Sequence, residues 1–291
     1  MTSSPVAFPV VSGQGGLPKV VLAAPDGARA EVYLYGAHVT SWVPPGGPEA
    51  GGEERLFLSR TSEFRPGAAI RGGVPVIFPQ FANEGPLPSH GFARVSLWKF
   101  SGVEAGPAPN VTAKFQLCDS ETTWHIWPHA FLAELDVTLG GQRLELAFRV
   151  TNLGDAPFEF TCALHTYLRV ADAHATVIEG LVRGTRYRER QSRLEGVQSE
   201  LDLKLSGPVD RVYQSASAQV AVRESARTTR VLSSGFRDVV VWNPWAERGA
   251  TLADLEQEGY RRMVCVEAAM IETPVRLDPA QSWQGTQTLV V

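Results

Sequence analysis

The sequence predicts an all-β protein, a large antiparallel β-sandwich with very little helix. Short segments rich in β-branched and aromatic residues recur along the chain, and Gly, Pro and Asn separate them. Helical periodicity is scarce, and no alternation of strands with helices indicates a parallel sheet. Many short strands joined by turns favour a sandwich.

The predicted strands are justified by apolar residues that recur with a period of two. The clearest case is residues 143–150, where Leu144, Leu146, Phe148 and Val150 alternate with mostly polar positions. In chain order, the expected strands are residues 19–23, 30–35, 38–43, 56–58, 111–117, 131–139, 143–152, 158–170, 176–179, 209–213, 219–222, 229–232, 238–243, 263–267 and 286–290.

Helix and loops are expected in few places. One short helix is predicted at residues 251–258, followed by Gly259. Residues 44–54 and 102–110 are expected to be exposed loops because Gly and Pro are abundant there. No internal repeat and no linker divides the chain, so we expect residues 1–291 to form a single domain.

Composition and charge exclude some partners. Of the 291 residues 44% are hydrophobic, enough for a large core, and the net charge is −4, with a pI near 5.9. An acidic chain is not expected to bind nucleic acid or an acidic membrane surface. Residues 183–193 contain five arginines, but Glu189 stands among them, so we interpret this run as a solvated strand and turn.

The three cysteines and the N-terminus indicate the compartment. Cys118, Cys162 and Cys265 are widely spaced, which predicts reduced thiols without a disulfide framework or a zinc site. The N-terminus resembles neither a secretory signal nor a transit peptide, and no apolar run approaches the roughly 20 residues that cross a bilayer. We therefore expect a cytoplasmic protein.

The histidine pattern does not favour a metal site. His125 and His129 have a spacing that can bind zinc, but Pro128 breaks the helix that would bring them together. We expect no metal and no other cofactor.

Residues 71–94 look like a site. Pro75 and Pro79 interrupt a short apolar run, and Arg71 and Arg94 stand at the two ends. His90 precedes Gly91, which would let another group approach closely. Two guanidiniums and an imidazole suggest an anionic ligand, although a surface loop with two solvated arginines is equally consistent.

A second candidate lies in residues 158–170. If this segment is a strand, His165 and Tyr167 share one face because side chains alternate. A histidine placed in this way can act as a general acid or base. The alternative is a structural histidine with satisfied hydrogen bonds.

A third candidate lies in residues 261–270. Glu267 falls on the opposite face from Val264 and Val266, so it is either exposed or held in a cleft, where it could act as a base. The alternative is a charge at a strand edge that discourages aggregation.

Aspartate and tryptophan side chains could contact a sugar. Asp210 could accept hydrogen bonds from hydroxyl groups, and Trp242 and Trp245 could pack on the apolar face of a ring. Each of these residues could equally be a strand end or part of the core.

Six segments together are distinctive. RGGVPVIFPQF, HGFAR, ALHTYL, VDRVY, VVWNPW and CVE, in this order, resemble the hexose-6-phosphate mutarotases, or glucose-6-phosphate 1-epimerases, of the aldose 1-epimerase superfamily. The resemblance extends from about residue 29 to the C-terminus. It implies a galactose mutarotase-like supersandwich and cofactor-free exchange of the α and β anomers of D-glucose 6-phosphate and related hexose 6-phosphates.

The resemblance also implies residue roles. His165 corresponds to the general acid and Glu267 to the general base. From their ordinary pKa values we expect an ionised Glu267 and a His165 that a nearby carboxylate keeps protonated.

The implied substrate contacts surround this pair. Arg71 and Arg94 correspond to the phosphate ligands, Asp210 to a contact with sugar hydroxyls, and His90 to a residue at the site. Ser89 stands where some relatives carry a glutamine that touches substrate, and its shorter side chain puts that contact in question.

Two other functions are compatible with the sequence. One is a non-catalytic protein that binds or senses sugar phosphates, and the other is a mutarotase for unphosphorylated aldoses. An acid and a base together favour an enzyme, and two arginines favour a phosphorylated substrate. We expect a monomer with no protein partner.

Overall fold

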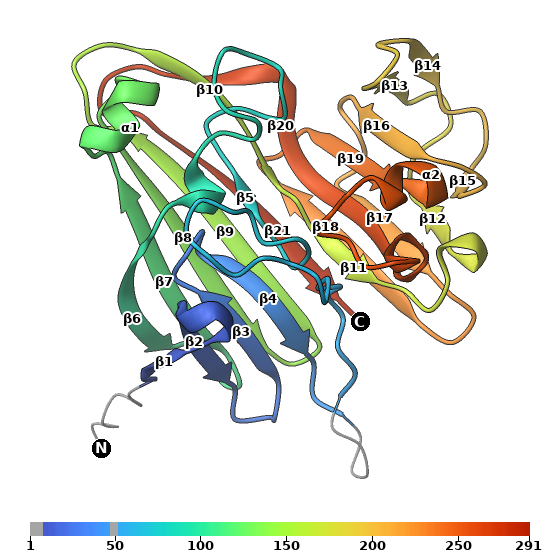
Figure 1. The fold of residues 1–291 in the computed structure, drawn as a ribbon, viewed down its shortest axis with the longest axis horizontal. Helices are drawn as coiled ribbons and strands as arrows, with labels where there is room; N and C mark the ends of the chain where they lie inside the picture. The colour runs from blue at the N-terminus through green and yellow to red at the C-terminus, as the bar shows by residue number, and fades with distance from the viewer. Residues whose placement is uncertain (1–7, 47–51) are drawn as a thin grey trace.

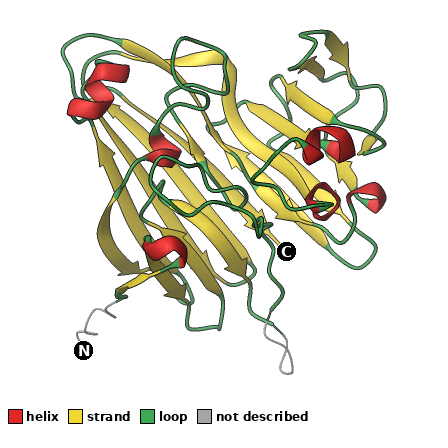
Figure 2. Ribbon diagram, viewed as in Figure 1, coloured by secondary structure: helices red, strands yellow, loops and turns green. Residues whose placement is uncertain are grey.

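The computed structural model describes residues 8–46 and 52–291, and its fold is all-β. Three sheets dominate the molecule (Figure 1), and every ladder between two named strands is antiparallel. The α-helices of the described residues are α1 (Glu121–Ile126) and α2 (Trp245–Ala250), as Figure 2 shows in red. In these residues no helix has the length and apolar character needed to cross a membrane.

The first sheet has four strands near the N-terminus. Its order is β1-β2-β3-β4, and the strands are β1 (Val10–Ser12), β2 (Pro18–Ala23), β3 (Arg29–Tyr33) and β4 (His38–Val43).

The second sheet has nine strands in the order β15-β12-β17-β18-β21-β9-β8-β7-β6. Its strands are β6 (Lys99–Ala105), β7 (Val111–Cys118), β8 (Phe131–Gly140), β9 (Arg143–Asn152), β12 (Val177–Glu179), β15 (Asp202–Lys204), β17 (Gln219–Arg223), β18 (Thr228–Ser234) and β21 (Ser282–Val290).

The third sheet carries the candidate site and has the order β14-β13-β16-β19-β20-β10-β5, with β11 also paired to β20. Its strands are β5 (Val76–Ile77), β10 (Phe158–Leu164), β11 (Tyr167–Arg169), β13 (Arg186–Glu189), β14 (Glu195–Val197), β16 (Val209–Tyr213), β19 (Asp238–Asn243) and β20 (Met263–Leu277). Short 3₁₀ helices lie between strands: η1 (Gln14–Gly16), η2 (Ala93–Val95), η3 (Ala173–Ala175) and η4 (Gly259–Arg262).

The main core joins one face of each sheet. Strand β8 buries every second residue, and β7 and β9 pair with it in register. Phe78 lies at the centre, with five aromatic rings of other residues at centroid distances of 5.3–6.0 Å. Burying one such large apolar side chain stabilises the fold by about 1.5–3 kcal/mol.

A second apolar cluster covers the opposite face of the third sheet. It includes Ala163, Tyr167, Val212, Val240 and Cys265. Neighbouring residues such as Leu164, Val241 and Val266 belong to the main core, because successive side chains of a strand point to opposite faces. Polar residues that are an even number of positions from a member of the second cluster on the same strand therefore point away from the main core.

The predicted helix at 251–258 is wrong. The helix is α2, six residues earlier, where the Asn243 side chain accepts a hydrogen bond from the Trp245 backbone. Residues 251–258 form turns because distant groups hold them: Ser59 Oγ accepts from the Glu256 backbone, and the Glu256 carboxylate accepts from the Arg60 backbone. Helix α1 was not predicted, since Ser120 and Thr123 cap each other reciprocally without the expected Glu or Gln.

Several predicted strand boundaries also need correction. The strand expected at 158–170 is interrupted at His165 and Thr166, between β10 and β11. Residues 56–58 make only isolated bridges, from Leu56 and Leu58. The loop expected at 102–110 begins inside β6. Strands β1, β5, β6, β14 and β15 were not predicted, whereas β13 lies within the strand and turn expected at residues 183–193.

The loop predicted at 44–54 lies partly outside the described residues. Of the described part, Pro44 is buried and the Glu54 carboxylate accepts hydrogen bonds from Ser41, Trp42 and Leu56. Both ends of this segment are therefore attached to the body of the protein and are not freely exposed.

Candidate active site

His165 and Glu267 form a cross-strand pair. The register pairs Leu164 with Ala268 and Tyr167 with Cys265, which places His165 opposite Glu267. His165 Nδ1 and Glu267 Oε1 are 3.3 Å apart. The interruption between β10 and β11 occurs at this point, where the His165 backbone donates to the Pro75 carbonyl.

Glu267 is almost completely buried, with 1% of its surface exposed. Strand β20 lies between β19 and β10, so the alternative of a charge at a strand edge is wrong. Glu267 Oε2 and His165 Nδ1 have no hydrogen-bond partner among the described residues. A buried carboxylate oxygen without a donor is available to accept a proton from a ligand.

Burial sets the protonation of this pair. Desolvation, followed by the charge of Asp210, raises the pKa of Glu267 well above its usual range. Desolvation also lowers the pKa of His165 well below its usual range, and His90, Arg94 and Arg71 add to this shift. Both pKa shifts run against the expected charged pair, because burial favours the uncharged form of both residues.

Tyr167 supports His165. Its ring lies parallel to the imidazole at a centroid distance of 4.7 Å, and Trp242 meets both rings edge to face. Burial raises the pKa of Tyr167, so its hydroxyl stays protonated at neutral pH. Trp242 is a buried member of the second apolar cluster, which agrees with the alternative of a core residue, whereas Trp245 stacks on His174 at 4.3 Å.

Arg71 is held by two neighbours. Its Nε and Nη2 donate to the two oxygens of Asp254 at 3.1 and 3.0 Å, and its Nη1 donates to the Tyr167 hydroxyl at 3.0 Å. The turn that follows needs glycine, because Gly72 has φ +116° and a Cβ there would lie 2.3 Å from the Phe57 carbonyl. The interpretation of Arg71 as a freely solvated arginine is wrong.

Arg94, at the other end of the 71–94 stretch, is also constrained. Its Nη2 donates to the Ser89 carbonyl at 3.1 Å, while its Nε is buried and has no hydrogen-bond partner among the described residues. A buried guanidinium donor without an acceptor is costly unless a ligand supplies one. Ser89 itself is exposed and takes part through its backbone.

His90 lies beside His165, with ring centroids 5.6 Å apart. Its backbone has φ +66°, and its Nδ1 accepts a hydrogen bond from the Ala82 backbone. Burial, Arg94 and Arg190 lower the pKa of His90, which keeps its ring neutral. The expected close approach at Gly91 is also present, because a Cβ there would lie 2.2 Å from the Phe78 carbonyl.

Asp210 faces two arginines. Its Oδ1 accepts from Arg190 Nε at 2.9 Å, and its Oδ2 accepts from Arg248 Nη1 at 3.1 Å. Each carboxylate oxygen has two lone pairs, so Asp210 can still accept a hydrogen bond from a hydroxyl group. Asp210 is in phase with Val212 on β16, which puts it on the same side of the sheet as Glu267.

The structure thus brings the predicted site residues to one face of the third sheet. Three further site residues were not predicted from the sequence: Asp254, Arg190 and Arg248. A signal existed for Arg190 only, because Arg186, Arg188 and Arg190 alternate with other residues along a strand. Asp254 lies in turns that carry no pattern.

Metal-binding residues do not gather anywhere in the described part of the chain. Residues 8–46 and 52–291 contain no group of three or more His, Cys, Asp or Glu side chains that could hold a metal ion. His125 lies in α1, which ends before Pro128 and His129.

Comparisons with known proteins agree with this geometry. Residues 18–290 match the family described as aldose 1-epimerase. A Cenchrus ciliaris protein named "Putative glucose-6-phosphate 1-epimerase" is 37% identical over 286 residues, which cover 95% of this chain and 85% of that protein. An Escherichia coli protein of the same name is 35% identical over 249 residues, covering 83% of this chain and 79% of that protein.

Solved structures show the same fold. The crystal structure of a "putative mutarotase" from Salmonella typhimurium superposes with a TM-score of 0.84 at 29% sequence identity. The match covers 97% of this chain and 96% of that one.

Proposed function

The chain belongs to the aldose 1-epimerase family, and on this basis we propose that it interconverts the α and β anomers of D-glucose 6-phosphate and related hexose 6-phosphates. The observation that carries the proposal is the buried pair of His165 and Glu267, 3.3 Å apart, with Arg71 and Arg94 nearby. The names of the relatives from Cenchrus ciliaris and Escherichia coli support a phosphorylated substrate.

The reaction needs one acid and one base. Glu267 takes the proton of the anomeric hydroxyl, His165 gives a proton to the ring oxygen, and the bond between C1 and the ring oxygen breaks. Rotation about the C1–C2 bond presents the other face of the aldehyde, and the ring closes with the two roles reversed. Each positioned acid or base contributes about 10²–10⁴ in rate, so the pair lowers the barrier by about 5–11 kcal/mol.

The substrate helps to charge the pair. Before binding, the pair shares one proton without net charge, because burial disfavours both charged forms. Arg71 and Arg94 repel a proton on His165, and a phosphate dianion bound to them offsets this repulsion. Binding therefore favours a protonated His165 beside an ionised Glu267, which is the form that the reaction uses.

The arginines supply the preference for phosphate. Arg94 Nε lacks a protein partner, and Arg71 is oriented by Asp254 and Tyr167 with N–H groups left over on Nη1 and Nη2. Charge-assisted hydrogen bonds from both guanidiniums are available to a phosphorylated sugar but not to plain glucose. Asp210 and His90 remain to contact the sugar hydroxyls.

NMR exchange between the anomers of glucose 6-phosphate tests the proposal. We expect the wild-type protein to accelerate exchange far above the rate in buffer, and to accelerate exchange of plain glucose much less. Binding of glucose 6-phosphate without any acceleration would instead indicate a sugar-phosphate sensor.

A further inference from the structure

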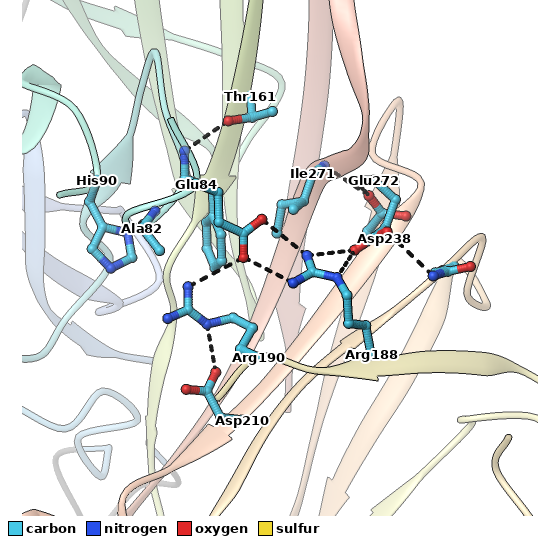
Figure 3. A network of polar contacts seen from close by, with 12 residues as sticks. Ala82, Glu84, His90, Thr161, Arg188, Arg190, Asp210, Asp238, Ile271 and Glu272 are labelled. Atoms are coloured by element: carbon cyan, nitrogen blue, oxygen red, sulfur yellow. Dashed lines mark hydrogen bonds and ion pairs between the residues drawn. The ribbon is translucent and has the colours of Figure 1, made fainter. Parts of the chain in front are cut away.

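Glu84 links the 71–94 stretch to the strands that carry the rest of the site. It is the single acidic residue between positions 79 and 94. Its two oxygens accept from Arg188 Nη1 and Nη2 at 3.1 and 3.0 Å, and Arg190 Nη1 lies 3.7 Å from Oε1. Figure 3 shows the Glu84 carboxylate between these two guanidiniums.

Each of the two arginines is attached to a strand of the site. Arg188 also donates from Nε and Nη2 to Glu272, at 2.9 and 2.8 Å, and Glu272 lies on β20, the strand of Glu267. Arg190 donates from Nε to Asp210 and from its backbone to the Asp210 carbonyl. The Glu84 carboxylate therefore connects the loop with β20 through one arginine and with Asp210 through the other.

Apart from the packing of Ala82 and Leu87 on the apolar clusters, the loop has few other attachments at this point. In the part of the chain that the structure describes, no other side chain of residues 82–90 is hydrogen-bonded outside positions 79–94. The Gln80 side chain and His90 Nδ1 hold the loop to itself. After His90 the chain is bound to the core again, because Gly91 bridges to Phe78 and the Phe92 and Ala93 backbones donate to the Phe78 carbonyl.

We propose that Glu84 is a positioning residue, which through Arg188 and Arg190 holds His90 on the loop at a fixed place relative to Asp210 on the sheet. The inference rests on the proposed function, since His90 and Asp210 are taken to contact the sugar ring from different elements. Paired hydrogen bonds between a guanidinium and a carboxylate fix orientation as well as distance, which suits this role. At the phosphate end, Arg71 is anchored independently by Asp254 and Tyr167, whereas the Arg94 side chain also donates to the Ser89 carbonyl of the loop.

The same strands offer a matched control. The Glu189 carboxylate accepts a hydrogen bond from Arg211 Nε at 2.6 Å. Glu189 follows Arg188 directly on β13, so this pair lies on the opposite face of the sheet from Arg188. Glu189→Gln therefore removes an ion pair of similar burial from the same strands without touching the loop. A loss caused only by weaker pairing of β13 would appear in both variants.

Hydrogen exchange and kinetics together test the proposal on the full chain. In Glu84→Gln we expect amides of residues 82–91 to exchange about 10-fold faster than in the wild type, with no such change in Glu189→Gln. We also expect kcat/KM to fall about 10-fold for glucose 6-phosphate and by a similar factor for glucose, because Arg71 keeps its contacts with Asp254 and Tyr167. Adding Arg188→Gln to Glu84→Gln should change the exchange of residues 82–91 little further, since Arg188 contacts the loop through Glu84 and its other partner, Glu272, lies on β20.

Hydrogen exchange tests whether Glu84 holds the loop, and the kinetics test whether that position matters for activity. Unchanged exchange of residues 82–91 in Glu84→Gln, or equal changes in Glu84→Gln and Glu189→Gln, would overturn the positioning role whatever the activity. Faster exchange with unchanged kcat/KM would overturn it as well. If the wild type does not accelerate anomer exchange, the proposed function fails, and the exchange measurement still decides whether Glu84 holds the loop.

Discussion

Arg71 donates a hydrogen bond of 3.0 Å to the hydroxyl of Tyr167, the residue whose ring lies parallel to His165. One side chain thus contacts both the arginine proposed to bind phosphate and the imidazole proposed to act as the acid. Asp254 completes the support of Arg71 from the other side. The site is therefore organised before any ligand binds, which lowers the cost of ordering it on binding.

Tyr167→Phe separates the two roles of this residue. The ring that packs on His165 is kept, while the hydrogen bond to Arg71 is lost. Hydrogen bonds to charged groups contribute about 1.5–3 kcal/mol, so we expect KM for glucose 6-phosphate to rise about 10-fold or more. Steady-state kinetics on glucose should show little change, and an equal loss on both sugars would contradict the assignment of Arg71 to phosphate.

Arg71→Ala and Arg94→Ala test the phosphate preference itself. Each change removes a guanidinium from the proposed clamp, and we expect kcat/KM for glucose 6-phosphate to fall about 10²-fold while that for glucose falls much less. The control is Arg143→Ala. Arg143 forms an ion pair with Glu145 on β9, a strand of the second sheet, whereas the candidate site lies on the third sheet. Equal losses on the two sugars would refute the clamp.

The pH dependence of kcat/KM follows from the directions of the pKa shifts. The competent pair carries one proton, so activity falls at low pH when His165 takes up a second proton and at high pH when Glu267 loses the last. Burial lowers the pKa of His165 and raises the pKa of Glu267. The plot of kcat/KM against pH should therefore be bell-shaped with a broad maximum. Kinetics across the pH range in which the fold is stable should place the acid limb below pH 6.5, and an acid limb above that value would contradict the account.

Stability should depend on pH through Glu267. The pKa of this carboxyl is raised by folding, so its contribution is fully present below its ordinary value of 4.5 and is lost as the pH rises through the folded value. Glu267→Gln cannot ionise, and the substituted protein should gain stability relative to the wild type as the pH increases. Urea unfolding at pH 6 and pH 9 measures this difference, and a difference that does not grow with pH would show that Glu267 is not penalised by burial.

Several strands could be predicted from the sequence with correct bounds, namely residues 143–152, 209–213 and 238–243. In 143–152 alternate residues are buried, whereas 238–243 is buried on both faces and was predicted from its run of β-branched residues. The candidate residues were found through six short motifs, and their assembly on one face follows from register, which links Leu164 to Ala268 across the sheet.

The rest depends on partners that are distant in sequence. Arg188 was interpreted as a solvated residue, yet Glu84 and Glu272 cover it, and these lie 104 and 84 positions away. Asp254 orients Arg71 across 183 positions. The pKa shifts of His165 and Glu267 also run against the expected charged pair, because ordinary pKa values take no account of burial in a sheet.

The most direct test of the central claim is the rate of anomer exchange of glucose 6-phosphate, measured by NMR for Glu267→Gln and His165→Ala. Either substitution leaves the phosphate contacts in place and removes one of the two proton carriers, so we expect each to reduce the catalysed rate about 10²–10⁴-fold. Glu159→Gln, an exposed carboxylate on β10, should exchange the anomers as fast as the wild type. Wild-type rates in both Glu267→Gln and His165→Ala would contradict the claim that this cross-strand pair opens and closes the sugar ring.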